Sequence, residues 1–382
     1  MKDSVTYDIT AWEQHYAYGL DGYALRQKIA VEEQSYEKPE LEHEYPEKPY
    51  AYLARWQDLD DVQLLSDLLK HDVKIRFTSS QIKIDDRMYD PGTLVITRSD
   101  NKNMSQFNET VQKLGKKHKQ PLHAVESGFS QSGTDLGSSA VRYMEKPKIA
   151  LLGGEGTSSN QVGEIWHYFD KQIDYPITML DTEYFDEVDL NSYDVFILPS
   201  GNYNSRIDSS RIADIKEWVT DGGKLIAVQN ANHFLAEQDG FDLKSKEGDD
   251  DDSEPSSQLD TYGEQQRKNI SDFNSGSIFK LTMDNTHPLA YGYDDAYFSL
   301  KLNADAYQYL DDGWNVGVAK EDAHMSGFIG YKAKEELENT LTFGVQNMGS
   351  GSVVYMVDNP LFRAFWYNGK LLFGNAVFMV GQ

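Results

Sequence analysis

The stretch from residue 147 to 236 restricts the fold of this chain most. Short segments that are apolar on both faces, at 148–154, 177–181, 194–201 and 224–229, alternate with segments of helical spacing at 158–173, 209–223 and 231–237. Such segments are typical of parallel strands covered by helices on both sides, joined by right-handed crossovers. We therefore predict an α/β fold with a doubly wound, mostly parallel sheet of the flavodoxin-like kind.

The rest of the chain divides around this unit. Residues 51–146 predict a smaller α/β domain, with strands at 50–56, 73–79 and 121–127, helices at 58–72 and 104–118, and a hairpin at 81–99 that turns at Asp85-Asp86. Residues 1–50 form an extended arm rich in aromatic residues, Pro and Glu, and its first part is too aromatic to be a free tail. Strand-like segments between 277 and 358 and a helix at 368–381 complete a domain of residues 147–382.

An acidic stretch at 237–276 interrupts this last domain and is predicted to be a surface insertion. Its four consecutive aspartates, residues 249–252, lack the alternating ligands and the Gly turn of an EF-hand loop, so a solvated acidic run is the better interpretation.

Composition excludes several classes of function. The net charge of −26 disfavours binding to nucleic acid, because phosphate contacts need clustered Lys and Arg. No apolar run approaches the roughly 20 residues that a membrane-spanning helix needs, so membrane insertion is not expected. The chain has no cysteine, which excludes a thiol nucleophile, disulfides and Cys-ligated zinc, and which is compatible with an exported protein.

The sequence GGKLIAVQNANHFL at 222–235 has the outline of a nucleophile elbow, a sharp strand-to-helix turn that presents a reactive side chain above a sheet. Ligands of doubly wound sheets bind at the carboxyl ends of the strands, near the switch in strand order. The residues predicted to line a pocket there are Gly153, Gly154, Glu155, Ser200, Gly201, Asn202, Gln229, Asn230 and His233. The alternative is that the glycines only make tight turns and that His233 is a hydrogen-bonded structural residue.

Two other arrangements carry a weaker signal. His123 and Glu126 have His-x-x-Glu spacing, and with His233 they would give three zinc ligands for a metal-dependent hydrolase. We disfavour this hypothesis because the pair lies outside the predicted large sheet. Ser200 follows a strand but lacks a recognisable His-acid pair, and the acidic pairs Asp294-Asp295 and Asp311-Asp312 are expected to be solvated surface.

Four segments together suggest a family: residues 148–170, 193–203, 218–231 and 353–378, which include the motifs LPSGNY and DNPLFRAFW. They resemble the class I glutamine-amidotransferase-like fold, in the version found at the C-terminal end of a branch of bacterial zinc carboxypeptidases. Residues 3–25 and 132–154 resemble the segment that follows the peptidase domain of that branch.

This resemblance implies that the chain is a piece of a longer, exported bacterial protein (periplasmic or extracellular) whose zinc and catalytic residues lie in a peptidase domain outside this chain. Catalytic members of the superfamily place a Cys at the elbow, and the matching position here is Asn230, preceded by Gln229. A carboxamide is neither a useful nucleophile nor a general base. We therefore expect no catalytic residue, metal or cofactor in this chain, and a role in scaffolding or presenting substrate to the peptidase domain. The alternative is a module that binds a peptide or glycan in the degenerate pocket.

Overall fold

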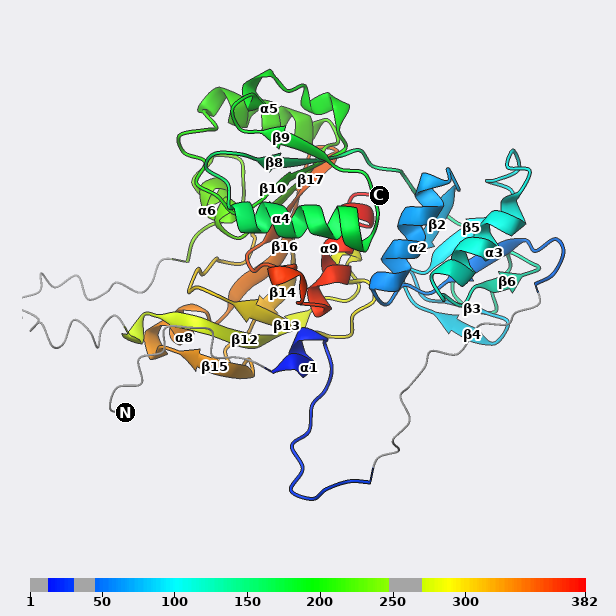
Figure 1. Ribbon diagram of the computed structural model, residues 1–382, viewed down its shortest axis with the longest axis horizontal. Helices are drawn as coiled ribbons and strands as arrows, with labels where there is room; N and C mark the ends of the chain where they lie inside the picture. The colour runs from blue at the N-terminus through cyan, green and yellow to red at the C-terminus, as the bar shows by residue number, and fades with distance from the viewer. Residues whose placement is uncertain (1–12, 31–44, 247–269) are drawn as a thin grey trace, which may run out of the picture.

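The computed structural model describes residues 13–30, 45–246 and 270–382, which form two domains side by side (Figure 1). The smaller domain has a five-stranded sheet in the order β6-β1-β5-β2-β7, and every pairing in it is antiparallel. Its elements are β1 (Ala51–Ala54), α2 (Leu59–Lys70), β2 (Ile75–Thr78), β3 (Ile82–Ile84), β4 (Arg87–Tyr89), β5 (Leu94–Thr97), α3 (Phe107–Lys117), β6 (His123–Val125) and β7 (Val141–Met144).

Local signals explain most of this domain. Asp58 starts α2 with a capping box, since its carboxylate accepts from the backbone N–H of Asp61 and the Asp61 side chain bonds back. The predicted turn at Asp85-Asp86 is confirmed, because both residues have the positive φ that a tight hairpin requires. The predicted hairpin was too long: it ends with β4, and β5 pairs with β1 and β2 of the five-stranded sheet instead. Strand β7 was not predicted. The alternation of buried and exposed residues is weak in this strand, since Arg142 and Tyr143 in its middle are both exposed.

The larger domain contains a ten-stranded mixed sheet, and one half of it is parallel. This half has the order β9-β8-β10-β11-β17, which is the flavodoxin-like order 2-1-3-4-5. Alternate strand side chains enter two separate apolar clusters, one under α4 and α9 and the other under α5 and α6. The elements are β8 (Ile149–Gly153), α4 (Ser159–His167), β9 (Thr178–Asp181), β10 (Val195–Leu198), α5 (Ser209–Thr220), β11 (Lys224–Val228), α6 (Asn230–Ala236), β17 (Gly351–Met356) and α9 (Asn368–Phe378).

The other half corrects the prediction of a mostly parallel sheet. Strands β12, β13, β14, β15 and β16 pair only antiparallel, and β16 joins them to β17 in the same sense. The cause lies in the connections: these strands follow one another without the crossover helices that parallel neighbours need. Their bounds are β12 (Asn274–Met283), β13 (Ala296–Lys301), β14 (Trp314–Ala319), β15 (Met325–Ile329) and β16 (Thr340–Met348), with α8 (Tyr331–Glu336) before β16.

Parts of the arm and of the stretch at 237–276 pack on the core. Helix α1 (Gln14–Ala17) packs on the large domain, where Ala17 is buried and Tyr16 stacks on Phe298 with ring centroids 4.2 Å apart. Within 237–276, Phe241 and Leu243 are buried, and β12 already begins at Asn274. The four aspartates at 249–252 lie outside the described residues. No helix of the described part has the length and apolar character to cross a membrane.

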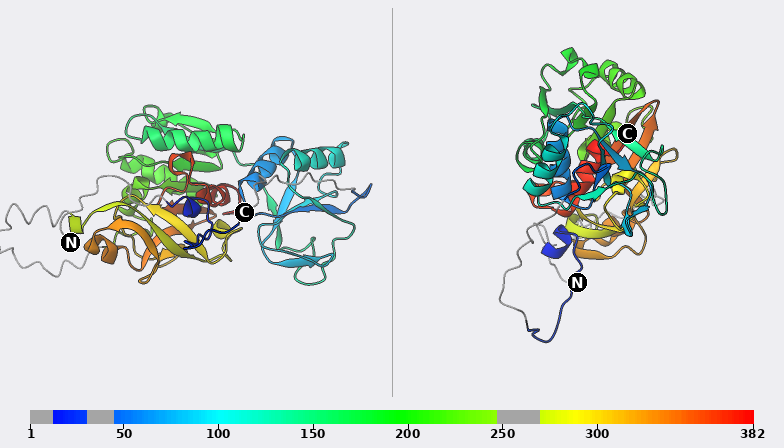
Figure 2. Two further views of the ribbon diagram at one scale, coloured as in Figure 1. Left: turned by 60° about the horizontal axis from the view of Figure 1, so that its bottom comes forward. Right: turned by 90° about the vertical axis from the view of Figure 1, so that its right-hand side faces the viewer.

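A buried amide joins the two domains. Asn375 of α9 is fully buried, and its Oδ1 accepts a 2.6 Å hydrogen bond from Nε1 of Trp56 in the small domain. Its Nδ2 donates to the carbonyl oxygens of Leu289 and Tyr291, at 3.0 and 2.7 Å. Helix α2 packs against α9 in the same region (Figure 2). One apolar cluster includes buried residues of both domains. The domains therefore share a continuous core.

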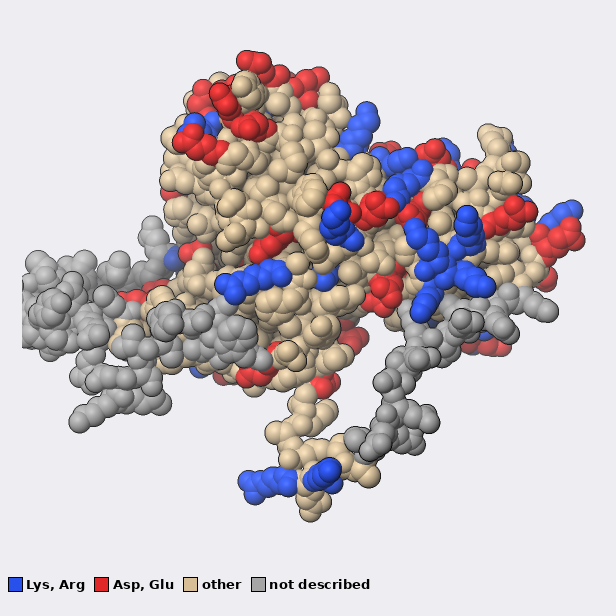
Figure 3. All heavy atoms as spheres, viewed as in Figure 1, with Lys and Arg blue, Asp and Glu red and all other residues tan. Residues whose placement is uncertain are grey.

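Charge is unevenly distributed on the surface. On the face drawn in Figure 3, acidic side chains lie over both domains, while the largest group of basic side chains lies over α2 and α3. Part of this basic group is neutralised internally, because the buried Asp67 carboxylate forms ion pairs with Lys117 of α3 at 2.5 Å and with Lys70 of α2 at 2.9 Å. The group therefore serves in part to hold α3 against α2.

Candidate functional site

The turn between β11 and α6 has the backbone of a nucleophile elbow. Gln229 adopts φ 50° and ψ −121°, a conformation that is strained for any residue with a Cβ. Asn230, which was expected at the nucleophile position, is instead the first residue of α6 and is exposed. The strained apex is therefore Gln229, one residue earlier than the sequence indicated.

Asn232 holds this turn in place. Its side chain is fully buried, and its Nδ2 donates to the carbonyl oxygens of Gln229 at 3.0 Å and of Met356 at 2.8 Å. The N–H of Gln229 also donates to the Met356 carbonyl at 2.8 Å, which extends the ladder between β11 and β17. The strain at Gln229 is thus maintained by a buried amide that sequence reasoning did not single out.

The side chain at the apex is engaged by α4. Gln161 is buried on α4, and its Nε2 donates to Oε1 of Gln229 at 2.5 Å. Its Oε1 accepts a hydrogen bond from the backbone N–H of Ser200 at the end of β10. A backbone N–H beside an elbow is the kind of donor that stabilises an oxyanion in hydrolases. Here that donor is already used inside the protein.

The switch in strand order lies between β8 and β10, and the loops that follow these two strands bind each other. The N–H of Ser158 donates to the Ser200 carbonyl at 2.7 Å, and the N–H of Asn202 donates to the Gly156 carbonyl at 2.8 Å. Thr157 and Gly201 form an isolated β-bridge. In open α/β sheets this crevice is where ligands bind. In this chain its backbone groups pair with one another.

The predicted pocket residues therefore separate into groups. Gly153 ends β8, and Gly154 and Glu155 lie on the loop that follows. Ser200, Gly201 and Asn202 lie on the loop bonded to it. Gln229 joins them only through Gln161. His233 lies apart on the exposed surface of α6, where its Nε2 is 3.4 Å from the Glu237 carboxylate. Glu155 forms an ion pair with Arg206.

The His123, Glu126 and His233 hypothesis finds no support in the geometry. His123 lies on β6 of the small sheet, where its Nδ1 is 2.5 Å from the hydroxyl of Tyr89 and its Nε2 is 3.3 Å from Asp85. His233 belongs to the large domain, and no three His, Asp or Glu side chains come together as metal ligands in the described part of the chain. Asp311 pairs with Lys244 at 2.7 Å on the surface.

An open cavity of about 550 Å³ lies next to the closed crevice, between α4, the elbow and the loop 359–364 that follows β17. Glu164 of α4 lines it: one carboxylate oxygen accepts from Nδ2 of Asn359 and the other from the backbone N–H of Arg363, both at 2.7 Å. Burial raises the pKa of Glu164. The buried Nδ1 of His167, which also lines the cavity, has no hydrogen-bond partner among the described residues.

Backbone strain is concentrated around this cavity. Gln229, Arg363 and Ala364 all line it, and all three have positive φ values, of 50°, 47° and 58°. Strained non-glycine residues cost of order 1–3 kcal/mol each and cluster at binding and active sites. Of the predicted residues only Gln229 lines this cavity. The motif DNPLFR, quoted for its resemblance, was the available signal for the opposite wall.

The fold and site define an α/β protein with a mixed sheet, a parallel flavodoxin-ordered half and an elbow without a nucleophile, preceded by a smaller antiparallel-sheet domain. No protein-family model matches the chain, and no curated protein matches it either.

Solved structures similar to it include a glutamine amidotransferase from Thermotoga maritima, at 12% identity and a TM-score of 0.36, covering 57% of this chain and 77% of that one. A protein described as ThuA-like from Parabacteroides merdae gives 12% identity and a TM-score of 0.36, over 59% of this chain and 89% of that one. The β-galactosidase of Rahnella sp. R3 gives 11% identity and a TM-score of 0.33, over 71% of this chain and 34% of that one. At these TM-scores the similarities carry no conclusion about what the chain binds or catalyses.

Proposed function

We propose that this chain is a non-catalytic accessory region of a bacterial zinc carboxypeptidase, which scaffolds or presents substrate to a peptidase domain of the same polypeptide. The observation that supports it is the elbow, where the apex is a carboxamide and the neighbouring backbone donor is occupied by Gln161. The link to a carboxypeptidase rests on the sequence resemblance of the segments quoted above. Zinc, on this proposal, belongs to the peptidase domain.

The purified chain tests the non-catalytic part. We expect no turnover of amide, ester or C-terminal peptide substrates, and no stoichiometric zinc by elemental analysis. Turnover that is lost in Gln229→Ala would overturn the proposal, because it would give the elbow a chemical role. Zinc that is lost in His123→Ala but kept in His71→Ala would restore the metal-dependent alternative.

A second candidate is binding of a peptide in the cavity beside α4. A carboxylate offers about four acceptor positions, and Glu164 uses one on each oxygen, so a ligand amino group can still bind to it. The cavity size lies within the usual range for ligand sites, about 300–1,000 Å³. The strained residues around it are a further feature typical of binding sites.

Gly163→Trp is a suitable blocking variant for this cavity. Gly163 lines it, and a Cβ at this position would meet no atom within 4 Å, so the tryptophan can enter the cavity without a clash. Gly137→Trp is the matched control, since its Cβ would also point into open space. The probe is tetra-alanine with a free amino group, compared with its N-acetylated form. We expect chemical-shift changes with the free amine only, absent in Gly163→Trp and kept in Gly137→Trp. Equal changes with both peptides would contradict this candidate.

A further inference from the structure

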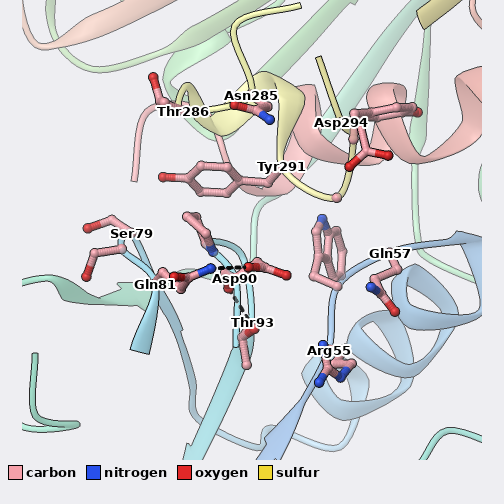
Figure 4. Close-up of a pocket in the computed structure, with 15 residues that line it drawn as sticks. Arg55, Gln57, Ser79, Gln81, Asp90, Thr93, Asn285, Thr286, Tyr291 and Asp294 are labelled. Atoms are coloured by element: carbon pink, nitrogen blue, oxygen red, sulfur yellow. Dashed lines mark hydrogen bonds between the residues drawn. The ribbon is translucent and has the colours of Figure 1, made fainter. Parts of the chain in front are cut away.

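A second cavity, of about 510 Å³, lies between the two domains and is separate from the elbow. Figure 4 shows that its walls come from both sides: Ser79, Gln81, Asp90 and Thr93 belong to the small domain, while Asn285, Thr286, Tyr291 and Asp294 belong to the large one. None of these residues belonged to a predicted pocket. The cavity exists only because the two domains are joined in a fixed arrangement.

The floor of this cavity is tightly built. Gly92 has φ +91°, and a Cβ there would approach Trp56 and Tyr291 to 3.0 Å. Gly292 has φ +85°, and a Cβ there would lie 2.8 Å from the carbonyl oxygen of Trp56. Both positions therefore need glycine for the domains to come this close. Asn375 also fixes the base of the cavity, because it bonds Nε1 of Trp56 and the backbone carbonyl of Tyr291, whose side chains are buried.

The walls of the cavity are rich in oxygen acceptors. The hydroxyls of Ser79 and Thr286 donate their own hydrogens into the protein, to Ala140 and Asp284, so their oxygens remain able to accept from a ligand. Asp90 is oriented by a 2.8 Å hydrogen bond from Nε2 of Gln81. Exposed amides and carboxylates complete the wall, namely Gln57, Asn285 and Asp294.

Charge and polarity narrow the class of ligand. The lining contains one cation, Arg55, and two carboxylates, Asp90 and Asp294, within a protein of net charge −26. Polyanions are therefore repelled from this site. The abundance of hydroxyls, amides and carboxylates disfavours a lipid or another apolar ligand. A neutral molecule with many hydroxyl groups satisfies these acceptors and donors.

We infer that this interdomain cavity is a binding site for a neutral saccharide. Planar carboxylate and amide groups, such as those of Asp90, Asp294 and Asn285, can each bond two neighbouring sugar hydroxyls. Because both domains contribute, the bound saccharide would also tie them together. This inference does not depend on a peptidase partner.

The test is titration of the chain with cellotetraose, maltotetraose and chitotetraose, followed by saturation-transfer NMR and calorimetry. We expect at least one of them to bind, and Asp294→Ala to weaken that binding about tenfold, as loss of a hydrogen bond to a charged group does. Asp295→Ala is the matched control: it removes a neighbouring exposed carboxylate that does not line the cavity, and should leave affinity unchanged.

Three results would overturn the inference. One is that none of the three saccharides binds. Another is that Asp294→Ala and Asp295→Ala bind equally, which would place the sugar elsewhere. The third is that Asn285→Ala, a wall variant on an exposed position, also leaves affinity unchanged.

Discussion

The amide of Asn375 is the most sensitive single point of the domain joint. In Asn375→Ala three buried groups lose their partner at once: Nε1 of Trp56 and the carbonyl oxygens of Leu289 and Tyr291. A buried polar group left unsatisfied costs about 1–3 kcal/mol. If one water enters the space left by the side chain and bonds some of these groups, we expect the free energy of unfolding to fall by about 3–5 kcal/mol. This is a large share of the roughly 5–15 kcal/mol by which proteins are stable.

Urea unfolding measures this loss. Far-UV circular dichroism follows the whole chain, and tryptophan fluorescence, to which the buried Trp56 contributes, follows the joint between the domains. We expect the fluorescence transition of Asn375→Ala to move to lower urea than the dichroism transition, because the small domain separates first. Asn347→Ala is the control, an exposed asparagine on β16 of the same domain. A free energy within 1 kcal/mol of the wild type, with the two transitions still coincident, would refute the reasoning about the joint.

Two further predictions concern the parallel half of the sheet. Gln161→Leu keeps the size of the side chain but leaves the Ser200 N–H and the Gln229 carboxamide without a partner. The free energy of unfolding in urea should therefore fall by about 1–3 kcal/mol. The control Asn160→Ala, at an exposed position of α4, should show no such fall. Burial lowers the pKa of Lys224 from 10.5 to about 7, so between these pH values the unfolded chain binds one more proton than the folded chain and stability rises with pH. Lys224→Met should remove that rise, and identical pH profiles for the two proteins would contradict the assignment.

Segments with strong periodicity were predictable from sequence. The parallel βα units from 148 to 237, the helix at 58–72 and the turn at Asp85-Asp86 are present because local spacing, capping and turn chemistry all favour the same structure there. The antiparallel half was misjudged. Its strands were identified, but a period-2 pattern does not say whether neighbouring strands run parallel or antiparallel. The available signal for antiparallel pairing was the lack of crossover helices between these strands.

The site was predictable only in outline. An elbow was inferred correctly from GGKLIAVQNAN, but the strained residue is set by the register of β11 against β17, which placed it at Gln229. Gln161 and Glu164 of α4 are far in sequence from Gln229 and from the loop 359–364, and they meet these partners only in the folded chain. The interdomain cavity was not predictable at all, because it depends on how two domains pack.

We have proposed that this chain serves a peptidase domain and has no chemistry of its own. The most direct test compares the natural polypeptide that contains this chain with a version lacking residues 13–382, by zinc content and by kcat/KM for release of C-terminal residues from peptides. We predict that both versions bind zinc and that the truncated one has the lower kcat/KM on long peptides. A natural polypeptide without zinc or carboxypeptidase activity, or a truncation that leaves kcat/KM unchanged, would contradict the account.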